Sequence, residues 1–195
     1  MAKVRFIEIA KPAKGRRFAI SDIHGCSKTF KALLDTIKLN PKDQLFLLGD
    51  LINRGPGSDK VLNRILKLKR KGIQVYILKG NHEDIVLKAH QRGTDNLKKT
   101  LKQLNSEKLA RGGILIDTYL DLLNESYHYI ILDKYYLVHA GFDFSIKNPF
   151  EDSHSMMYIK EFKPNKRLLE KKRVVLGHSP KGIQEIINRL KASNR

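Results

Sequence analysis

The sequence is poor in cysteine and has no long apolar run. Of its 195 residues one is cysteine, Cys26. This excludes a scaffold held by internal disulfides and favours a reducing compartment, so we expect a cytoplasmic protein. No run approaches the roughly 18 apolar residues that cross a bilayer. The first 17 residues hold no apolar stretch long enough for a signal peptide. We therefore expect no membrane partner.

Acidic residues are also scarce. The chain has 38 Lys and Arg residues against 20 Asp and Glu, which gives a formal charge of +18. Such an excess suits a polyanionic partner such as nucleic acid, although a solvated lysine-rich surface would explain it equally well. Hydrophobic residues make up 41% of the sequence, enough for a core at this length, which argues against intrinsic disorder. The length predicts one domain, residues 1–195.

Strand-like and helix-like segments alternate in the first half of the chain. Short apolar runs predict strands over residues 17–21, 44–48 and 73–78. Apolar residues with the i, i+3, i+4, i+7 spacing predict helices over residues 27–37 and 58–71. This order of segments is typical of parallel βαβ units, and it places the chain in the α/β class.

The second half is less regular. Residues 84–124 are helix-like around a polar stretch, and we expect a small helical insertion there. Two strand-like runs at 127–132 and 135–138 are joined by two polar residues, which predicts a β-hairpin. A last strand is predicted over residues 173–176, and the basic segment from Gly182 onward is helix-like.

Polar side chains with metal-binding chemistry follow five of the strand-like runs. The five motifs are SDIHG at 21–25, GDLINRG at 49–55, GNHE at 80–83, HAG at 139–141 and GHS at 177–179. In open α/β sheets, ligands bind beyond the carboxyl ends of the strands. We therefore expect these side chains to meet at one rim. Five such motifs, each placed after a strand, are hard to explain as unrelated polar turns.

The side chains collected in this way suit two divalent transition metals. Asp22 and Asp50 offer carboxylates and Asn81 offers an amide oxygen, beside several imidazoles. Two metals about 3.5–4 Å apart lower the pKa of a bridging water and hold phosphoryl oxygens, which suits in-line attack of hydroxide on phosphorus. The planar fork of Arg54 matches phosphate oxygens. His82 is placed to donate a proton to the leaving oxygen.

In this order the motifs resemble those of the calcineurin-like metallophosphoesterases, phosphoprotein phosphatase branch. The bacterial protein-phosphatase-like and diadenosine tetraphosphatase-like members are the most similar. The resemblance covers nearly the whole chain, and it implies a four-layer αββα sandwich in which two mixed sheets are flanked by helices. It also implies two divalent metal ions, with Mn²⁺ preferred and Fe, Zn or Ni as alternatives.

The resemblance further implies two ligand sets that share the Asp50 carboxylate. The first set comprises Asp22, His24 and Asp50. The second set comprises Asp50, Asn81, His139 and His178. Members of the family usually continue with further strands after the last motif, so either this chain is truncated or its second sheet is shorter.

Other implied roles concern the substrate. Arg54 and Asn81 would bind its phosphate, with Lys160 a candidate where the family usually has a second arginine. His82 would be the general acid. Asn53 stands where the family's protein phosphatases have an aspartate that orients this histidine. Asn53 can accept a hydrogen bond from His82 but carries no charge, so we expect it to weaken general-acid catalysis.

The resemblance leaves the substrate open. Our main expectation is a phosphatase of phosphomonoesters, similar to serine/threonine or tyrosine protein phosphatases. The alternative is a hydrolase of dinucleoside polyphosphates or a pyrophosphohydrolase of RNA 5′ ends. Residues 54–58 support this alternative, because they resemble the bacterial symmetrical diadenosine tetraphosphatases. A third interpretation is a nucleic-acid-binding protein on a weakened phosphatase scaffold, although the complete ligand set argues against it.

Overall fold

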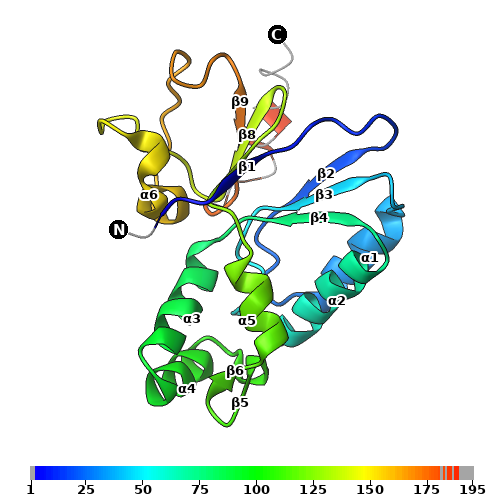
Figure 1. Ribbon diagram of the computed structural model, residues 1–195, viewed down its shortest axis with the longest axis vertical. Coiled ribbons are helices and arrows are strands. Elements are labelled where there is room, and N and C mark those ends of the chain that lie inside the picture. The colour runs from blue at the N-terminus through cyan, green and yellow to red at the C-terminus, as the bar shows by residue number, and fades with distance from the viewer. Residues whose placement is uncertain (1–2, 181, 183, 186, 189–195) are drawn as a thin grey trace.

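The computed structural model describes residues 3–180, 182, 184–185 and 187–188. Two β-sheets pack against each other, and helices flank them (Figure 1). The first sheet has the order β2-β3-β4 and is wholly parallel; its strands are β2 (Arg17–Ile20), β3 (Gln44–Leu47) and β4 (Gln74–Ile77). The second sheet is mixed; in spatial order its strands are β1 (Phe6–Glu8), β7 (Tyr129–Ile131), β8 (Tyr135–Val138) and β9 (Arg173–Val175). The predicted α/β sandwich is confirmed, with one sheet mixed and the other parallel among its described strands.

The parallel sheet arises from two βαβ units, as the sequence predicts. Helices α1 (Ser27–Ile37) and α2 (Ser58–Arg70) connect its strands and cover one face. Every residue of β3 is buried because both faces of the strand are covered. Leu45 and Leu47 belong to the cluster beneath the helices, whereas Phe46 faces the second sheet.

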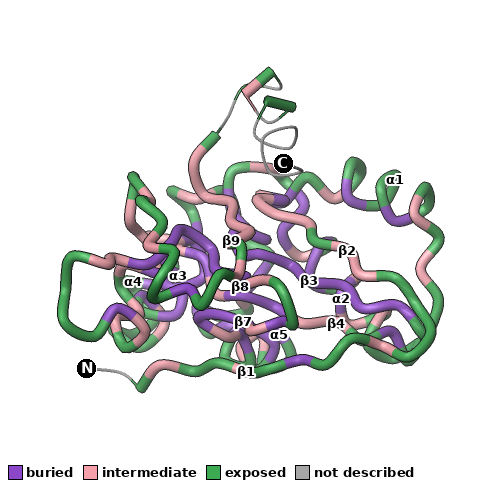
Figure 2. The backbone as a smooth tube through the Cα atoms, turned by 90° about the horizontal axis from the view of Figure 1, so that it is seen from above, coloured by how far each residue is buried: buried purple, intermediate pink, exposed green. Residues whose placement is uncertain are grey.

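The two sheets share an apolar layer, and the mixed sheet has a second one on its outer face. The layer between them consists of Ile9, Phe46, Leu48, Leu78, Ile130, Leu132 and Leu137. On the outer side, Tyr129, Tyr136 and Val138 pack with residues around helix α6 (Ser153–Tyr158). Helices, parallel sheet, mixed sheet and outer segment form four layers. In Figure 2 the central strands β3 and β8 are mostly purple, which marks them as buried.

The segment expected to be a helical insertion contains three helices and an unpredicted hairpin. The helices are α3 (Asn81–Gln91), α4 (Thr94–Gln103) and α5 (Asp117–Asn124). After the short 3-10 turn Glu107–Leu109, strands β5 (Ala110–Arg111) and β6 (Ile114–Leu115) pair antiparallel. Gly112 and Gly113 between them have φ values of 58° and 82°, which a two-residue hairpin turn favours. The adjacent glycines are the sequence signal for this hairpin.

The predicted β7–β8 hairpin is confirmed, but other elements of this half differ from expectation. Strand β1, helix α6 and the 3-10 turn Pro149–Glu151 were not predicted. Strand β1 is only three residues long, and its Phe6 is 53% exposed. The sequence therefore shows no alternation of apolar and polar residues long enough to predict this strand. The basic tail predicted to be helical falls largely outside the described residues. Within those residues no helix has the length and apolar character that a bilayer crossing requires.

Candidate metal centre

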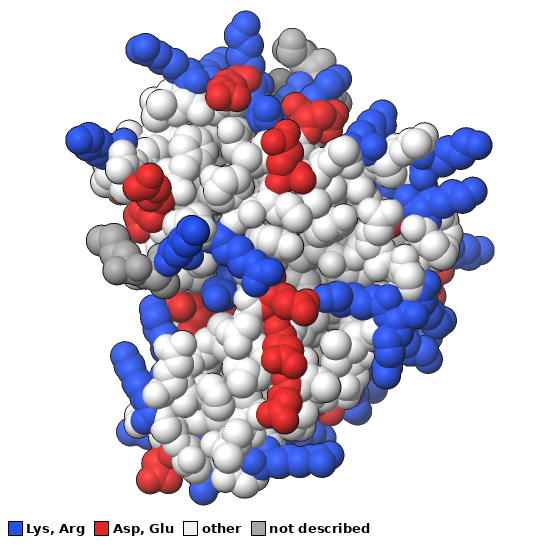
Figure 3. Space-filling model, viewed as in Figure 1, with Lys and Arg blue, Asp and Glu red and all other residues white. Residues whose placement is uncertain are grey.

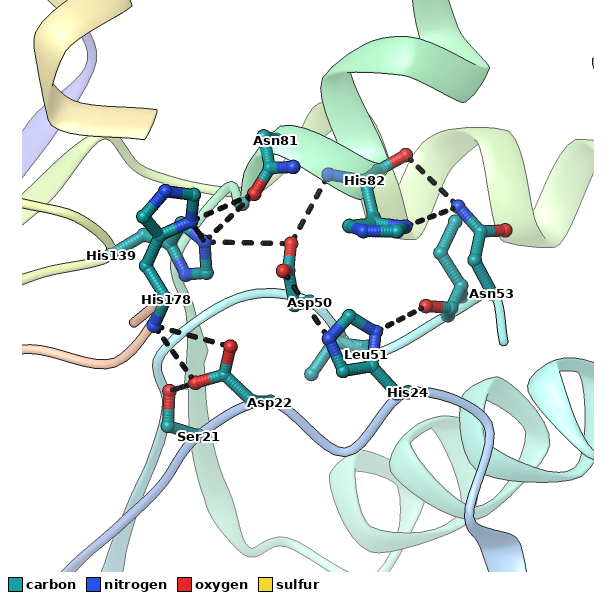
Figure 4. Close-up of polar contacts among 12 residues, drawn as sticks. Ser21, Asp22, His24, Asp50, Leu51, Asn53, Asn81, His82, His139 and His178 are labelled. Atoms are coloured by element: carbon teal, nitrogen blue, oxygen red, sulfur yellow. Dashed lines mark hydrogen bonds and ion pairs between the residues drawn. The ribbon is translucent and has the colours of Figure 1, made fainter. Parts of the chain in front are cut away.

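The five motifs meet where the two sheets adjoin (Figure 4). Loops after β2, β3 and β4 contribute from the parallel sheet, and loops after β8 and β9 contribute from the mixed sheet. The residues that meet there are Asp22, His24, Asp50, Asn53, Asn81, His82, His139 and His178. As expected, the loops that follow the strands bring these side chains together in one place.

The backbone at these positions is strained. Of the ten non-glycine residues with positive φ among the described residues, six belong to the motifs: Asp22, His24, Asp50, Asn53, Arg54 and His178. Such conformations are uncommon for residues other than glycine, and each costs of order 1–3 kcal/mol. The surrounding packing must impose them, and their concentration here is typical of a functional site.

Asp50 lies at the middle of the cluster. Its Oδ2 is 3.5 Å from Nε2 of His24, and its Oδ1 is 3.5 Å from Nε2 of His139. Potential ligand atoms of Asp50, His139 and His178 lie within 4.8 Å of one another, and so do those of Asp50, His24 and His82. The carboxylate therefore lies between His24 on the side of one oxygen and His139 on the side of the other.

Two histidines have tautomers that the surrounding carbonyl groups define. Nδ1 of His139 is 2.7 Å from the carbonyl oxygen of Leu48, and Nδ1 of His24 is 3.3 Å from that of Ile52. A carbonyl oxygen can only accept, so Nδ1 carries the proton in each ring. Nε2 then presents a lone pair toward Asp50. Metal-binding histidines are commonly held in this way, with the other ring N–H donating to a carbonyl.

The chemistry of the donor set fits a cation. Oδ1 of Asn81 is 3.1 Å from Nε2 of His139 and 3.1 Å from Nδ1 of His178, and these two nitrogens are 3.2 Å apart. With Nε2 of His139 unprotonated, lone pairs of several side chains converge on one point. Rotation of the Asn81 amide would let its nitrogen donate to the same atoms. A bound divalent cation would satisfy these lone pairs with the oxygen facing inward.

Asp22 lies at the edge of the cluster. Both oxygens of its carboxylate accept from the backbone N–H of His178, at 3.1 and 3.0 Å, and Ser21 Oγ donates to it. Among the described residues, Asp22 is not in either compact group of potential ligands. The structure thus brings Asp22 to the edge of the centre through the backbone of His178.

Glu83 is a buried carboxylate to which the sequence analysis gave no role. Its oxygens accept from the backbone N–H groups of Asp50 at 2.8 Å, Leu51 at 2.8 Å and Gly80 at 2.9 Å. Glu83 is fully buried and joins the loops after β3 and β4. It therefore holds Asp50 and the start of α3 in place. Its position beside Asn81 and His82 in the GNHE motif is the signal that would have pointed to it.

Burial and nearby charges favour the neutral forms of the titratable side chains in the site. Burial raises the pKa of the Asp50 carboxyl and of the neighbouring Glu83 carboxyl. Burial also lowers the pKa of His24 and His178, and lowers that of His82 to about 4, with Arg54 contributing in each case. Neutral imidazoles keep a nitrogen available as a ligand. Arg54 opposes the rise in the pKa of Asp50, and a bound divalent cation would stabilise this carboxylate further.

Arg54 and Lys160 are exposed residues at the edge of the centre. The charge of Arg54 lowers the pKa of three site histidines, and that of Lys160 contributes at His178, so both act on the cluster. The carbonyl oxygen of Lys160 accepts from Ser179 Oγ at 3.4 Å, which fixes the Lys160 backbone beside the last motif.

Asn53 contacts His82 in the direction opposite to expectation. Its Nδ2 is 3.1 Å from Nδ1 of His82 and 3.5 Å from the His82 carbonyl oxygen. The Asn53 Oδ1 is buried and has no hydrogen-bond partner among the described residues. An amide nitrogen can only donate, so Nδ1 of His82 is the acceptor and the ring proton is on Nε2. His82 is consequently a neutral donor.

A comparison with protein families assigns the chain. The model of the calcineurin-like phosphoesterases matches residues 16–193. The chain belongs to this family. Membership implies divalent metal ions, and the His and Asp groups around Asp50 are where this phosphoesterase offers ligands.

Several curated relatives of this phosphoesterase are named bis(5′-nucleosyl)-tetraphosphatase, symmetrical. The one from Nitrosomonas europaea is 35% identical over 130 residues, 64% of this chain and 44% of the relative. The one from Wigglesworthia glossinidia brevipalpis is 49% identical over 67 residues, 34% of this chain and 24% of the relative. The chain thus spans less than half the length of these relatives.

Solved structures agree on the fold. A candidate diadenosine tetraphosphatase has a TM-score of 0.54 and 27% identity, covering 71% of this chain and 55% of its own. A serine/threonine phosphatase from Saccharomyces cerevisiae has a TM-score of 0.52 and 16% identity, covering 80% and 52% respectively. At that identity the yeast protein supports the fold alone.

The positive charge is not confined to the metal centre. In Figure 3, Lys and Arg side chains project around the rim and are dense on the right, where Figure 1 places α1 and α2. Net charge therefore does not identify the ligand of this phosphoesterase, because a solvated surface accounts for much of it.

Proposed function

We propose that this phosphoesterase hydrolyses a phosphoanhydride bond in dinucleoside polyphosphates, using two divalent cations bound around Asp50. Relatives named as symmetrical tetraphosphatases support this substrate class. The observation that carries the proposal within the chain is the contact of the Asn53 amide with His82. Phosphomonoesters, our main expectation from the motifs, become the weaker candidate for the reason given below.

The ligands proposed for the cations are those that the motifs suggest. His24 and Asp50, with Asp22 from the edge of the cluster, would hold one ion. Asp50, Asn81, His139 and His178 would hold the other. Mn²⁺ is the ion to test first. Bound there, the two cations would supply Lewis-acid polarisation of the phosphoryl group and an activated water.

Around these ions, residues of the chain would bind and orient the substrate. Arg54 and Lys160 lie at the edge of the centre, where a guanidinium and an ammonium group pair with phosphate oxygens. Glu83 holds the Asp50 and Gly80 amides, so the position of the Asp50 carboxylate is fixed before substrate binds. Such preorganisation avoids rearrangement during the reaction.

The protonation state of His82 determines which leaving groups the site can assist. Because Asn53 donates to its Nδ1, the imidazole is neutral and its remaining proton is on Nε2. A neutral imidazole stabilises a leaving oxygen by a hydrogen bond but is a poor proton donor. A serine or threonine alkoxide needs a proton, whereas a nucleoside diphosphate leaves readily as an anion. The bond broken would be P–O within the polyphosphate; water adds its OH to one half and its proton goes to the other.

The proposal is tested by comparing three substrates on one preparation. The purified chain is stripped of metal, reloaded with Mn²⁺, and assayed on diadenosine tetraphosphate, a phosphoserine peptide and p-nitrophenyl phosphate. We expect the highest kcat/KM on diadenosine tetraphosphate, with two ADP molecules as products. A higher kcat/KM on the phosphopeptide would overturn the proposal in favour of a protein phosphatase.

A further inference from the structure

A groove of about 820 Å³ lies beside the metal centre and is formed by two segments. One wall is residues 142–145, which directly follow the HAG motif, and the other consists of residues between 159 and 167. The volume lies in the range of about 300–1,000 Å³ that is usual for small-molecule sites. Among the residues named so far for metal or phosphate binding, none lines it.

Both walls of the groove begin at the metal centre. The first wall continues from His139 through Gly141. Phe162 belongs to the second segment without lining the groove, and it packs on that glycine so closely that a Cβ atom at Gly141 would lie 2.9 Å from the Phe162 Cβ. The second segment also includes Lys160, which does not line the groove and whose carbonyl oxygen accepts from Ser179 Oγ at 3.4 Å. A molecule bound in the groove would therefore extend toward the proposed phosphate position.

An aromatic ring with a fixed orientation lines the groove. The centroid of the Phe144 ring lies 5.8 Å from that of Phe142, 6.1 Å from that of Phe150 and 6.0 Å from that of Phe162. These contacts hold the ring, while its partial exposure leaves part of it facing the groove. A held aromatic ring is a suitable surface for stacking a nucleobase.

Three cations line the opposite wall. Lys163, Lys166 and Arg167 are exposed, and in the part of the chain that the structure describes none forms an ion pair. Of the two acidic residues in the groove, Asp143 is occupied by Ser145, whose N–H and Oγ donate to it at 2.9 and 2.6 Å. With Glu161 the groove holds three cations against two carboxylates, and this excess of positive charge favours an anionic ligand.

The second wall is anchored in the core. Leu169 is 2% exposed and belongs to the same cluster as Phe142. Asn165 Oδ1 accepts from the backbone N–H of Arg167 at 3.1 Å and of Leu168 at 3.2 Å. These contacts define the turn that carries Arg167, so the cations and the aromatic ring keep a set spacing.

From this combination we propose that the groove binds one nucleoside diphosphate half of the substrate, with its base against Phe144 and its phosphates near Lys163 and Arg167. This inference rests on the proposed function and deepens it. It makes the groove the element that distinguishes a dinucleotide from a small phosphomonoester, which reaches the metals without entering the groove.

The test measures ADP binding without turnover. In the full chain, with chelator present and at low ionic strength, the Kd for ADP is measured by calorimetry for wild type and for K163S/R167S. Two charge-assisted phosphate contacts are lost, so we expect the Kd to rise by about 10-fold or more. The matched control K99S/K102S removes two exposed cations of helix α4 and should leave the Kd within about 2-fold.

A second variant separates the contribution of the base to ADP binding from that of the phosphates. Phe144→Leu should raise the Kd for ADP by about 5-fold or more while leaving inorganic pyrophosphate binding unchanged, and Phe144→Tyr should restore ADP binding. In Mn²⁺-loaded protein, K163S/R167S and Phe144→Leu should raise KM for diadenosine tetraphosphate relative to p-nitrophenyl phosphate, whereas Phe144→Tyr should keep KM near the wild-type value.

The outcomes separate the two proposals. Unchanged ADP affinity in both K163S/R167S and Phe144→Leu would overturn the groove assignment, whatever the wild-type activity. Groove-dependent ADP binding in a protein that fails to hydrolyse diadenosine tetraphosphate would support the nucleotide site and overturn the proposed substrate.

Discussion

The side-chain nitrogen of Asn53 lies 3.1 Å from Nδ1 of His82, and both residues are buried. This contact ties a residue of the GDLINRG motif to one of the GNHE motif. It fixes the His82 ring as neutral, with Nε2 as the donor. An aspartate at position 53 would reverse the polarity of the contact, because a carboxylate accepts and favours a protonated ring.

The first prediction follows from this polarity. Asn53→Asp should raise kcat on a phosphoserine peptide by about 10–100-fold, the size typical of changes in residues that support catalytic groups. On diadenosine tetraphosphate, kcat should change little because its leaving group needs less proton donation. Full kinetics on both substrates check this. An equal effect on the two would contradict the leaving-group argument.

The second prediction concerns metal removal. Treatment with a chelator should lower the melting temperature, and Mn²⁺ at 100 times its Kd should restore about 2.7 kcal/mol of stability for each bound ion. Asp50→Asn should lose most of this gain, since Asp50 faces both groups of ligands. Asp35→Asn, on the exposed surface of α1, is the control and should respond to Mn²⁺ as wild type does. Calorimetric titration should give two ions per chain, and a single site would contradict the bridging role.

The third prediction concerns Glu83. In Glu83→Gln one acceptor oxygen becomes an NH₂ group that faces backbone N–H donors, so the free energy of unfolding should fall by about 1–3 kcal/mol. Mn²⁺ affinity should fall by about 10–100-fold. Glu125→Gln, an exposed carboxylate paired with Lys69, should leave both quantities near wild type. Denaturant titration and metal-binding calorimetry measure the two effects, and wild-type Mn²⁺ affinity in Glu83→Gln would rule out a positioning role.

The fourth prediction concerns pH and lies away from the centre. The Asp43 carboxylate is buried and accepts from Arg16 Nη2 at 2.7 Å and from the Arg16 backbone N–H at 2.8 Å. The Arg16 guanidinium holds the pKa of Asp43 well below its usual range. The lowered pKa contributes stability that is present above about pH 4, the usual value for Asp, and is lost as the pH falls toward the folded-state pKa.

Asp43→Asn should therefore be less stable than wild type at pH 7, and the difference should shrink below about pH 4. Urea titrations at pH 7, 5 and 3 would show it. The exposed Asp35→Asn should show a small effect at every pH. A difference for Asp43→Asn that stays constant down to pH 3 would mean that the charge of Asp43 is not the cause.

The sequence was most informative where periodicity and motifs agreed. The helices observed as Ser27–Ile37 and Ser58–Arg70 were predicted to within a residue at each end, because an apolar stripe directly reflects burial on one face. The gathering of Asp22, Asp50 and Asn81 was predictable because β2, β3 and β4 are parallel and end at a common edge of one sheet. His139 comes from the other sheet, so its approach depends on how the two sheets pack.

Features that depend on distant packing were not predictable in the same way. The role of Glu83 requires knowing that the Asp50 and Leu51 amides point at it, and these lie 33 and 32 residues away in sequence. The direction of the Asn53 contact depends on how the buried amide is packed. The hairpin at Gly112 and Gly113 did carry a local signal, but the helical pattern around it hid two-residue strands.

The contact between Asp22 and His178 bears on the order in which the chain folds. The Asp22 carboxylate accepts from the backbone N–H of His178 at 3.0 Å, across 156 positions of the chain. Contacts this far apart form late, since the intervening chain must be ordered first. During synthesis, a ribosome-bound chain lacking the last motif would have Asp22 without its partner and the centre incomplete. The two ends of this contact would then meet only when the segment around His178 docks on the loop after β2.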